Sequence, residues 1–183
     1  MDNCEQREIY TAILDAVEEA NSCTRDKSKP TCFFIDGPAG TGKSYLLNGL
    51  IKNLKVLKYN VLPNATTGIA ADLLEGGRTV HSRFKIPLFI DKENELDVSA
   101  DSFLGKSIIE SNIIIIDEVS AMNKTILVLI NKLLMKLMRK GDIFGGKVMV
   151  LSGDFRQTLP IIEGVSSEII ITDASLLKLP LFT

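Results

Sequence analysis

The sequence lacks the features that mark a secreted, metal-bound or membrane protein. It has only three cysteines, Cys4, Cys23 and Cys32, an odd number without the close paired spacing of a zinc site. Its longest purely aliphatic run, residues 113–116, is far shorter than the roughly 20 residues that a membrane helix needs. The N-terminus has neither the basic nor the apolar stretch of a secretory signal. We therefore expect an intracellular protein with reduced thiols and no membrane partner.

No charge of one sign dominates either. Lysine and arginine together number 21 and aspartate and glutamate 23, which leaves a formal net charge of −2 at pH 7. Without a global positive field, any contact with nucleic acid would have to come from a local strip of basic residues. The 183 residues are 45% hydrophobic and 24% charged, close to the averages for globular proteins, so disorder, collagen and coiled coil are poor descriptions of the whole chain. One domain over residues 1–183 is the simplest organisation.

Hydrophobic periodicity predicts alternating helices and strands. Apolar residues at helical spacing predict helices over residues 5–20, 43–58, 69–74 and 122–140. Short runs of strand-forming residues predict strands at 32–35, 59–62, 113–116 and 147–151. The interval 91–102 is acidic and weakly apolar, so we expect it to be a surface insertion. This alternation indicates an α/β fold with a parallel sheet, helices on both of its faces and a ligand site beyond the carboxyl ends of the strands.

The first chemical motif is GPAGTGKS, which matches the phosphate-loop pattern Gly-x-x-x-x-Gly-Lys-Ser/Thr. Its glycines let successive backbone N–H groups curl around a phosphate, and the following helix adds the positive end of its dipole. Lys43 can reach the β- and γ-phosphates of a nucleotide, and the hydroxyl of Ser44 can ligate magnesium. The predicted nucleotide-binding residues are Gly37, Pro38, Ala39, Gly40, Thr41, Gly42, Lys43, Ser44 and Tyr45.

The second motif is an acidic pair, Asp117 and Glu118, that directly follows the aliphatic run 113–116. A phosphate-loop enzyme needs a carboxylate for its magnesium at this place. Asp117 is therefore the metal candidate, and Glu118 is the candidate base that would orient and deprotonate the attacking water. Taken alone, an Asp-Glu pair is usually the solvated start of a helix. The preceding strand and the phosphate loop together favour the catalytic interpretation.

The third motif is SGDFRQTLP at residues 152–160, again at the end of a predicted strand. It places Asp154, Arg156 and Gln157 in a short turn. If the three strands before the motifs are neighbours, their polar groups meet at one edge of the sheet. Gln157 could then hydrogen-bond the γ-phosphate or the attacking water and report the nucleotide state. The alternative, a capped loop closed by Pro160, is not rejected by composition.

Together these motifs resemble the first motor domain of the Pif-family DNA helicases, particularly the Helitron-transposon-like branch. The similarity runs from EQREIY to about DASLL and includes FFIDGPAGTGKS, NATTGIAADLLEGGRTVHSRFKIPL, IIIIDEVSAM and GGKVMVLSGDFRQTLPII. Phosphate-loop kinases and GTPases share the first of these motifs, but not HSRFKIPL or GDFRQTLP. The resemblance implies a RecA-like fold that binds ATP and Mg²⁺, and it assigns the reading of the adenine base to Gln6.

The resemblance also implies ATP-driven unwinding of DNA by 5′-to-3′ movement along one strand. The implied roles are recombination, repair and telomere maintenance, with a nuclear location in a eukaryote and single-stranded DNA or DNA junctions as partners. The residues add a possible contact surface, in which the helix start at Thr66, Thr67 and Gly68 could hold a DNA phosphate. Charge and a stacking face would come from Arg78, His81, Arg83, Phe84 and Lys85. A few basic residues around a phenylalanine are otherwise usually a solvated face.

The chain departs from this family by ending at Thr183, shortly after the third motif. The family carries a second RecA-like domain, which closes over ATP and supplies an arginine finger worth roughly 10³–10⁵ in rate. We therefore expect the isolated chain to bind Mg-ATP but to hydrolyse it feebly and not to unwind DNA. Full activity would need such a domain, in cis or in trans.

Two other functions remain open. The chain could be a truncated binding module or transposon remnant that holds nucleotide or DNA without turnover, although a decaying copy should soon lose Lys43, Asp117, Glu118 and Gln157. It could also be a small-molecule kinase of the phosphate-loop class. Such a kinase needs an arginine-bearing lid, and the segment DKENELDVSADS contains no arginine.

Overall fold

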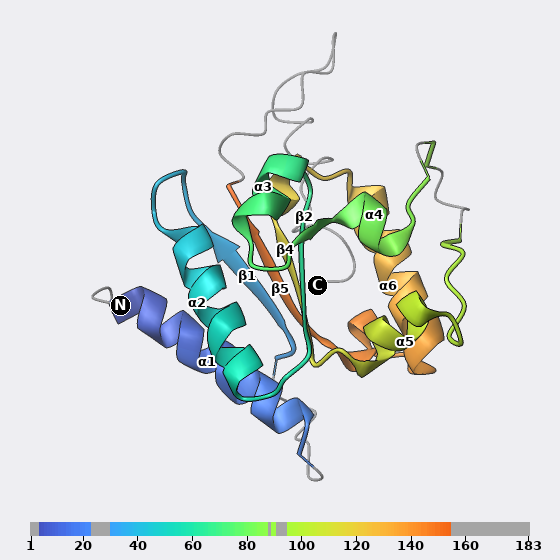
Figure 1. The fold of residues 1–183 in the computed structure, drawn as a ribbon, viewed down its shortest axis with the longest axis horizontal. Coiled ribbons are helices and arrows are strands. Elements are labelled where there is room, and N and C mark those ends of the chain that lie inside the picture. Colours follow the sequence, from blue (N-terminus) through green and yellow to red (C-terminus); the bar gives the residue numbers. More distant parts are fainter. Residues whose placement is uncertain (1–3, 23–29, 88, 91–94, 155–183) are drawn as a thin grey trace, which may run out of the picture.

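A parallel sheet between two layers of helices forms the fold (Figure 1), seen in a computed structural model that describes residues 4–22, 30–87, 89–90 and 95–154. Its strands within these residues are β1 (Cys32–Asp36), β2 (Val61–Ala65), β3 (Arg78–Thr79), β4 (Ile113–Asp117) and β5 (Val148–Gly153). They lie in the order β1-β5-β4-β2-β3, and every neighbouring pair is parallel. The predicted parallel α/β architecture is confirmed, and the carboxyl ends of the strands share one edge of the sheet.

Helices cover both faces of this sheet (Figure 1). One face carries α1 (Cys4–Ala20), α2 (Lys43–Val56) and α3 (Gly68–Leu73). The other carries α4 (Val80–Phe84), α5 (Phe103–Glu110) and α6 (Lys124–Met138). Two short 3₁₀ turns, Val119–Ala121 and Ile143–Gly146, precede and follow α6. None of the described helices combines the length and the apolar character needed to cross a bilayer.

The central strands are apolar throughout because they feed both layers. On β4, Ile113 and Ile115 pack in the cluster that contains α1 and α2, whereas Ile114 and Ile116 pack in the cluster that contains α5 and α6. All four side chains are fully buried. A parallel strand covered on both faces has no solvent side on which polar residues could alternate. The interpretation of the run 113–116 as a doubly buried strand is therefore confirmed.

Cys32, on β1, is half-buried. It packs against the cluster around α6, and burial raises the pKa of its thiol to about 12. A thiol with so high a pKa stays protonated at neutral pH and is therefore a poor nucleophile.

Backbone turns move some boundaries away from the predicted ones. Lys58 adopts a left-handed backbone (φ 65°), and the N–H of Tyr59 returns to the carbonyl of Leu54 (2.9 Å). This tight turn ends α2 earlier than residue 58 and delays β2 to residues 61–65, whereas the apolar pattern predicted a strand at 59–62. The sequence did not predict β3, α4 or α5. β3 and α4, with two and five residues, are too short to show a clear period.

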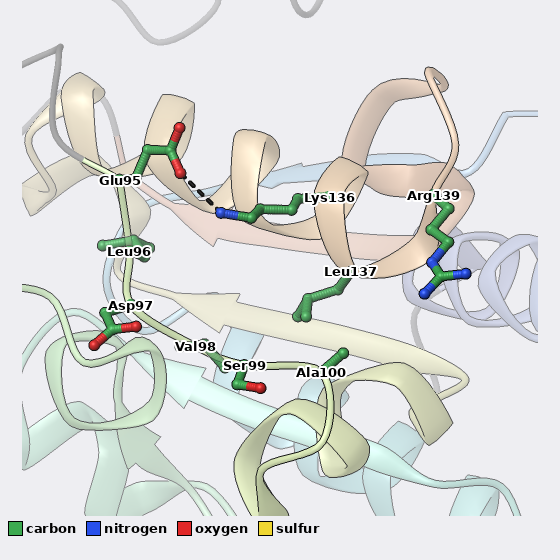
Figure 2. Close-up of a pocket in the computed structure, with 9 residues that line it drawn as sticks. All are labelled: Glu95, Leu96, Asp97, Val98, Ser99, Ala100, Lys136, Leu137 and Arg139. Atoms are coloured by element: carbon green, nitrogen blue, oxygen red, sulfur yellow. Dashed lines mark hydrogen bonds and ion pairs between the residues drawn. The ribbon is translucent and has the colours of Figure 1, made fainter.

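The acidic interval 91–102 is not wholly the surface insertion that the sequence predicted. Leu96 and Val98 are only 5% and 7% exposed and belong to the same apolar cluster as α6. Figure 2 shows residues 95–100 beside α6, with Glu95 paired to Lys136 (2.8 Å). The pocket between them has a volume of about 420 Å³. Both charged groups are exposed, so the pair adds little stability. Residues 91–94 lie outside the described part of the chain.

Lys147, just before β5, fastens the end of α5 to the sheet. Its Nζ donates to the carbonyls of Ile109 (2.7 Å), in the last turn of α5, and of Ser111 (2.6 Å), just after it. The last carbonyls of a helix have no partner within the helix. The side chain of Lys147 is buried, and burial, with the nearby charge of Lys140 second, lowers the pKa of its ammonium group from 10.5 to about 8. The hydrogen bonds thus offset part of the cost of burying a charge.

Lys147→Met should abolish a specific pH dependence of stability. Because the pKa of Lys147 is lower in the folded than in the unfolded chain, the unfolded chain binds more protons between pH 8 and 10.5. The free energy of unfolding of the wild type should therefore gain on the order of 3 kcal/mol from this group as the pH rises through that window. Denaturant unfolding of wild type, Lys147→Met and the control Lys52→Met, at an exposed lysine on α2, at several pH values tests this. Equal slopes in wild type and Lys147→Met would contradict it.

Candidate nucleotide-binding site

Three neighbouring strands bring the predicted motifs to one edge of the sheet. β1 ends at Asp36, where the phosphate loop begins, β5 ends at Gly153 and β4 ends at Asp117. Asp36 pairs with Gly153 in the ladder, and β5 in turn pairs with β4. The phosphate loop, the acidic pair and the start of the third motif therefore share this edge. Arg156 and Gln157 lie outside the described residues.

Two left-handed glycines shape the phosphate loop, residues 37–42. Gly40 has a φ of 84° and Gly42 a φ of 85°, a conformation that costs a residue with a side chain about 1–2 kcal/mol. The N–H of Gly37 donates to the carbonyl of Gly153 on β5 (3.2 Å). β5 therefore fixes where the loop starts, and the N-terminus of α2 is where it ends, with the positive end of the helix dipole at the loop.

Lys43, the first residue of α2, turns its ammonium group back into the loop. Its Nζ donates to the carbonyl oxygens of Gly37 and Pro38, the latter at 3.1 Å. A neutral carbonyl is a weaker partner for an ammonium group than a charged phosphate oxygen. Lys43 is thus held inside the loop by contacts that a phosphate can replace, and together with the loop glycines this chemistry fits a polyphosphate.

Gln6, near the start of α1, joins that helix to the phosphate loop. Its Nε2 donates to the carbonyl of Thr41 (3.0 Å), and a Cβ added at Gly42 would lie 3.0 Å from the same nitrogen. Beside this contact α1, β1 and the loop line a cavity of about 280 Å³, whose wall includes Gln6, Ile9 and Lys43. A hollow with apolar walls and a few polar groups suits a small organic ligand. The reading of adenine by Gln6 stays a prediction. Tyr45, also predicted to contact nucleotide, is 68% exposed on the first turn of α2.

The backbone holds the acidic pair in place on both sides. Asp117 is only 3% exposed; its Oδ1 accepts the N–H of Glu118 (2.9 Å), and its carbonyl accepts the N–H of Thr66 (3.1 Å). Glu118 adopts a left-handed backbone (φ 55°), an uncommon conformation that concentrates at functional sites. The two adjacent carboxylates therefore lie in different environments, one buried and one half-buried.

Oxygen donors that suit magnesium come from two elements at this edge. The half-buried Ser44 stands in the first turn of α2, and Asp117 ends β4. Hydroxyl and carboxylate oxygens fit Mg²⁺, which is usually held by one or two carboxylates, substrate phosphates and waters. In the ranges that the structure describes, no three His, Cys, Asp or Glu side chains gather as a metal cluster. A hydroxyl and a carboxylate fit an ion that is shared with a phosphate.

A contact that the motifs did not predict joins the acidic loop to β5. The Oγ of Ser120 accepts the N–H of Asp154 (3.2 Å). The backbones are so close that a Cβ added at Gly153 would lie 3.0 Å from the nitrogen of Ser120. The sequence signal that could have indicated this contact is Gly153 at the end of β5, because a glycine in a strand often marks the close approach of another backbone.

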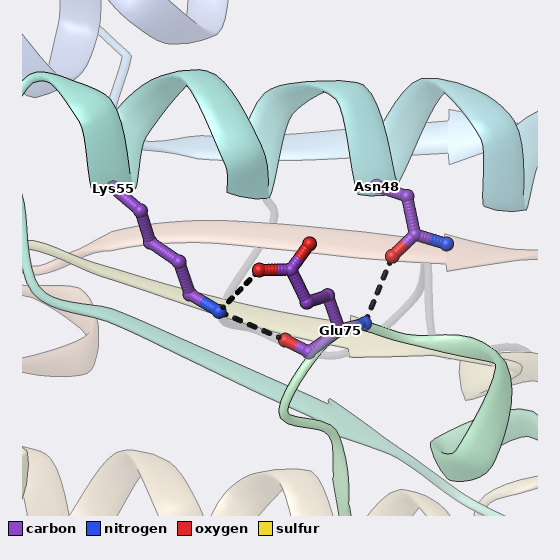
Figure 3. Close-up of polar contacts among 3 residues, drawn as sticks. All are labelled: Asn48, Lys55 and Glu75. Carbon is purple, nitrogen blue, oxygen red and sulfur yellow. Dashed lines mark hydrogen bonds and ion pairs between the residues drawn. The ribbon is translucent and has the colours of Figure 1, made fainter.

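The connection between α3 and β3 is fastened to α2 by polar contacts. Asn48 accepts the N–H of Glu75 (2.9 Å), and the Nζ of Lys55 contacts the carboxylate (3.1 Å) and the carbonyl (3.3 Å) of Glu75 (Figure 3). Gly77 permits the tight turn that follows, because a Cβ there would lie 2.2 Å from the carbonyl oxygen of Ala71. These contacts set the position of α3 relative to the helix that starts at the phosphate loop.

The predicted helix start at residues 66–68 is present and partly engaged. α3 begins at Gly68, and the hydroxyl of Thr67 caps it by accepting the N–H of Ala70 (3.2 Å). The N–H of Thr66 is already donated to Asp117, so it cannot also hold a DNA phosphate in this conformation. Thr67 and Gly68 are exposed, and their contact with DNA stays a prediction.

Part of the predicted basic strip lies inside the protein. Phe84 is fully buried in the cluster around α6, so the stacking face that the sequence suggested is absent. The Nε of the half-buried Arg83 donates to the Oδ1 of Asn64 (3.1 Å), and burial, with Arg78 second, lowers the pKa of the Arg83 guanidinium group. Of the other predicted residues, His81 is half-buried, whereas Arg78 and Lys85 are exposed.

Asn64, a buried residue on β2 that the motifs did not single out, completes the contacts of Arg83. Its Nδ2 donates to the carbonyls of Leu62 (2.9 Å) and Ile115 (3.2 Å). An asparagine inside a strand is a detectable signal, because a buried amide needs partners for both its oxygen and its nitrogen. Asn64 thus connects α4 to β4, two residues before Asp117.

Comparison with known proteins identifies similar sequences over most of the chain. A family model described as PIF1-like helicase matches residues 1–179. The ATP-dependent DNA helicase Pif1 of Psychrobacter sp. is 34% identical over 130 residues, and the ATP-dependent DNA helicase RRM3 of Saccharomyces cerevisiae is 29% identical over 165 residues. These alignments cover 70% and 88% of this chain, but 20% and 23% of the relatives. The chain therefore spans about a fifth of the length of the curated relatives it matches.

The fold is similar as well. The crystal structure of a Pif1 helicase from Bacteroides in complex with ADP-AlF3 and ssDNA matches with a TM-score of 0.71 and 27% sequence identity. The match covers 94% of this chain and 36% of that one. The predicted RecA-like α/β fold is thereby confirmed.

Alanine at Gly42 should destabilise the protein more than alanine at Gly40. Both substitutions place a side chain on a left-handed backbone and should cost about 1–2 kcal/mol. Only the Cβ at position 42 also meets the amide of Gln6, and it should displace the hydrogen bond from Gln6 to Thr41 at a further cost of about 1 kcal/mol. Denaturant unfolding measures both costs.

A Gln6→Ala background provides the control for this comparison. Once the glutamine amide is gone, Gly42→Ala and Gly40→Ala should cost the same. If the excess cost of Gly42→Ala persists without Gln6, the contact between Gln6 and the loop is not its source.

Proposed function

Because the chain belongs to the PIF1-like helicase family, as its motifs indicated, we propose that it is the first RecA-like motor domain of an ATP-dependent DNA helicase. The domain would bind and hydrolyse Mg-ATP and couple this cycle to movement along single-stranded DNA. One observation carries the proposal. At the carboxyl edge of three neighbouring strands, a phosphate loop that holds its lysine meets a buried aspartate and a glutamate with a left-handed backbone.

Nucleotide binding rests on the loop and its lysine in this proposal. The N–H groups at the left-handed glycines and at the start of α2 receive the phosphates. Lys43 exchanges the carbonyls of Gly37 and Pro38 for phosphate oxygens, so its charge is held ready before the ligand arrives. Gln6 presents its amide beside the cavity between α1 and the loop, where it can select the base.

Hydrolysis rests on the acidic pair. Ser44 and Asp117 would hold Mg²⁺, which supplies positive charge to the phosphate oxygens. Glu118, half-buried next to Asp117, orients the attacking water and accepts its proton. Gln157 is proposed to sense the γ-phosphate or that water; it follows Asp154, the last described residue of the same edge, by three positions.

Single-stranded DNA or a DNA junction is the proposed polynucleotide partner. The support is the similarity to the Bacteroides Pif1 that was crystallised with ADP-AlF3 and ssDNA. On this chain the exposed Thr67 and Gly68 and the exposed basic residues Arg78 and Lys85 are the candidates for phosphate contact. Arg83 is assigned instead to positioning this segment through Asn64.

The wider activity of the protein is also a proposal. Since the relatives are about five times as long as the matched region, we propose that a second RecA-like domain, in cis or in trans, completes the nucleotide site. We extend to this chain 5′-to-3′ movement, roles in recombination, repair and telomere maintenance, and a place inside the cell, in the nucleus of a eukaryote.

Two substitutions should separate nucleotide binding from chemistry. Lys43→Ala should weaken Mg-ATP binding at least tenfold, because a charge beside the phosphates is lost, about 1.4 kcal/mol or more. Glu118→Gln should leave binding within about twofold and slow single-turnover hydrolysis by about 10²-fold, the low end for a general base. Calorimetry and single-turnover assays measure the two quantities.

Lys52→Ala, an exposed lysine on α2, is the matched control and should change neither quantity. An equal loss of binding in Glu118→Gln would contradict its role as base. Binding of Mg-ATP without any turnover that depends on Lys43 would favour an inactive nucleotide-binding module over a motor.

Neutralising the exposed basic residues should weaken DNA binding in a salt-dependent way. The double variant Arg78→Gln/Lys85→Gln removes two candidate phosphate contacts. A plot of log K against log salt for a single-stranded oligonucleotide has a negative slope, and this slope should become shallower by about 1.4. The double variant Lys52→Gln/Lys140→Gln makes the same change in net charge at other exposed positions. A similar loss of slope in both double variants would refute a local contact strip.

A further inference from the structure

We propose that Ser120 is a positioning residue for hydrolysis. Its hydroxyl joins the end of β5, by a hydrogen bond from the N–H of Asp154, to the loop that carries Glu118. The inference rests on the proposed function, because it concerns the orientation of the proposed base. Ser120 touches neither nucleotide nor water in this role. It acts by holding two segments of the site in one arrangement.

Three segments of the site meet at Gly153. Its carbonyl accepts the N–H of Gly37, the first residue of the phosphate loop (3.2 Å). The next N–H along the chain, that of Asp154, donates to the Oγ of Ser120 (3.2 Å). The end of β5 is therefore bonded to the phosphate loop on one side and to the acidic loop on the other.

The closeness of these backbones leaves little room for independent movement. A Cβ added at Gly153 would lie 3.0 Å from the nitrogen, 3.1 Å from the Oγ and 3.2 Å from the Cβ of Ser120. A side chain at position 153 would therefore collide with Ser120, and only glycine lets the acidic loop lie so near the end of the strand. A shift of the 3₁₀ turn at residues 119–121 would break or stretch the hydrogen bond between Ser120 and Asp154.

The two flanks of the acidic pair are held by different means. On the β2 side the carbonyl of Asp117 accepts the N–H of Thr66 (3.1 Å) and also its hydroxyl at a longer distance (3.4 Å), so a backbone bond remains whatever the side chain. On the β5 side the bond runs through the hydroxyl of Ser120. Since Glu118 lies between these two attachments in a left-handed conformation, losing the second one frees its backbone to relax.

The first test measures turnover and binding in the full chain. Ser120→Ala should leave the Kd for Mg-ATP within about twofold and lower the single-turnover rate by about tenfold, because a small misplacement of a catalytic group is costly. Ser120→Thr, which keeps a hydroxyl, should recover most of the rate. Combined with Glu118→Gln, Ser120→Ala should cause no further loss, since it acts through that residue.

Ser111→Ala is the matched control. Ser111 is a buried serine whose hydroxyl donates to the carbonyl of Ile108 (2.7 Å) at the end of α5. Its loss should lower the free energy of unfolding without slowing turnover. If Ser120→Ala lowers stability in the same way and leaves the rate unchanged, Ser120 is merely structural and the proposal is wrong.

The second test does not depend on catalysis. Amide hydrogen exchange of the chain without nucleotide should show Asp154 exchanging roughly fivefold faster in Ser120→Ala, the effect of losing one hydrogen bond. The amides of residues 118–121 should also exchange faster in this variant. If only Asp154 exchanges faster, the hydrogen bond does not restrain the acidic loop and the proposal is wrong. If the wild type shows no ATP turnover that depends on Lys43, the proposed function fails. Hydrogen exchange then still decides whether Ser120 restrains the acidic loop.

Discussion

The whole candidate site depends on the parallel register of β1, β5 and β4 at their carboxyl ends. Because Asp36 lies opposite Gly153, the N–H of Gly37 meets the carbonyl of Gly153, and the phosphate loop starts from a fixed point. β4, on the other side of β5, then delivers the acidic pair to the same edge. If the register of β5 shifted by one residue, its side chains would point to the opposite faces of the sheet. The phosphate loop would then no longer lie level with the acidic pair. The apolar packing of the two central strands thus secures the geometry of a polar site.

That packing also allows unfavourable features to persist where the chain leaves β4. Glu118 has a positive φ angle, and Asp117 places a carboxylate where only 3% of the residue is exposed. Both features cost free energy, and the cost is tolerated because the strands β4 and β5 are buried on both faces. The phosphate loop avoids such a cost, because its two left-handed positions, Gly40 and Gly42, are glycines.

The sequence predicted the sheet well and the connections poorly. The four-isoleucine run of β4 and the pattern GPAGTGKS are strong signals, because each is set by a local physical requirement, burial on two faces and room for a phosphate. The contacts of Asn64 with Arg83 and of Ser120 with Asp154 join residues 19 and 34 positions apart, and no periodicity encodes such pairs. Phe84 shows the opposite error: a phenylalanine among basic residues suggested a stacking surface, yet tertiary packing buries it completely.

The burial of Arg83 and Phe84 changes how the nucleotide edge and the basic segment can communicate. Arg83 bonds to Asn64, and Asn64 bonds to the carbonyl of Ile115 on β4, two residues before Asp117. The segment from β3 to α4 is therefore attached to the strand that carries the acid, through side chains that are inside the protein. Thr66, bonded to the carbonyl of Asp117, attaches the start of α3 to the same strand. Both attachments converge on the end of β4, so α3 and α4 are joined to the same strand through polar contacts. If the chain acts as proposed, this strand is the route by which the nucleotide edge and the basic segment would be coupled, and the exposed cations Arg78 and Lys85 would contact the DNA.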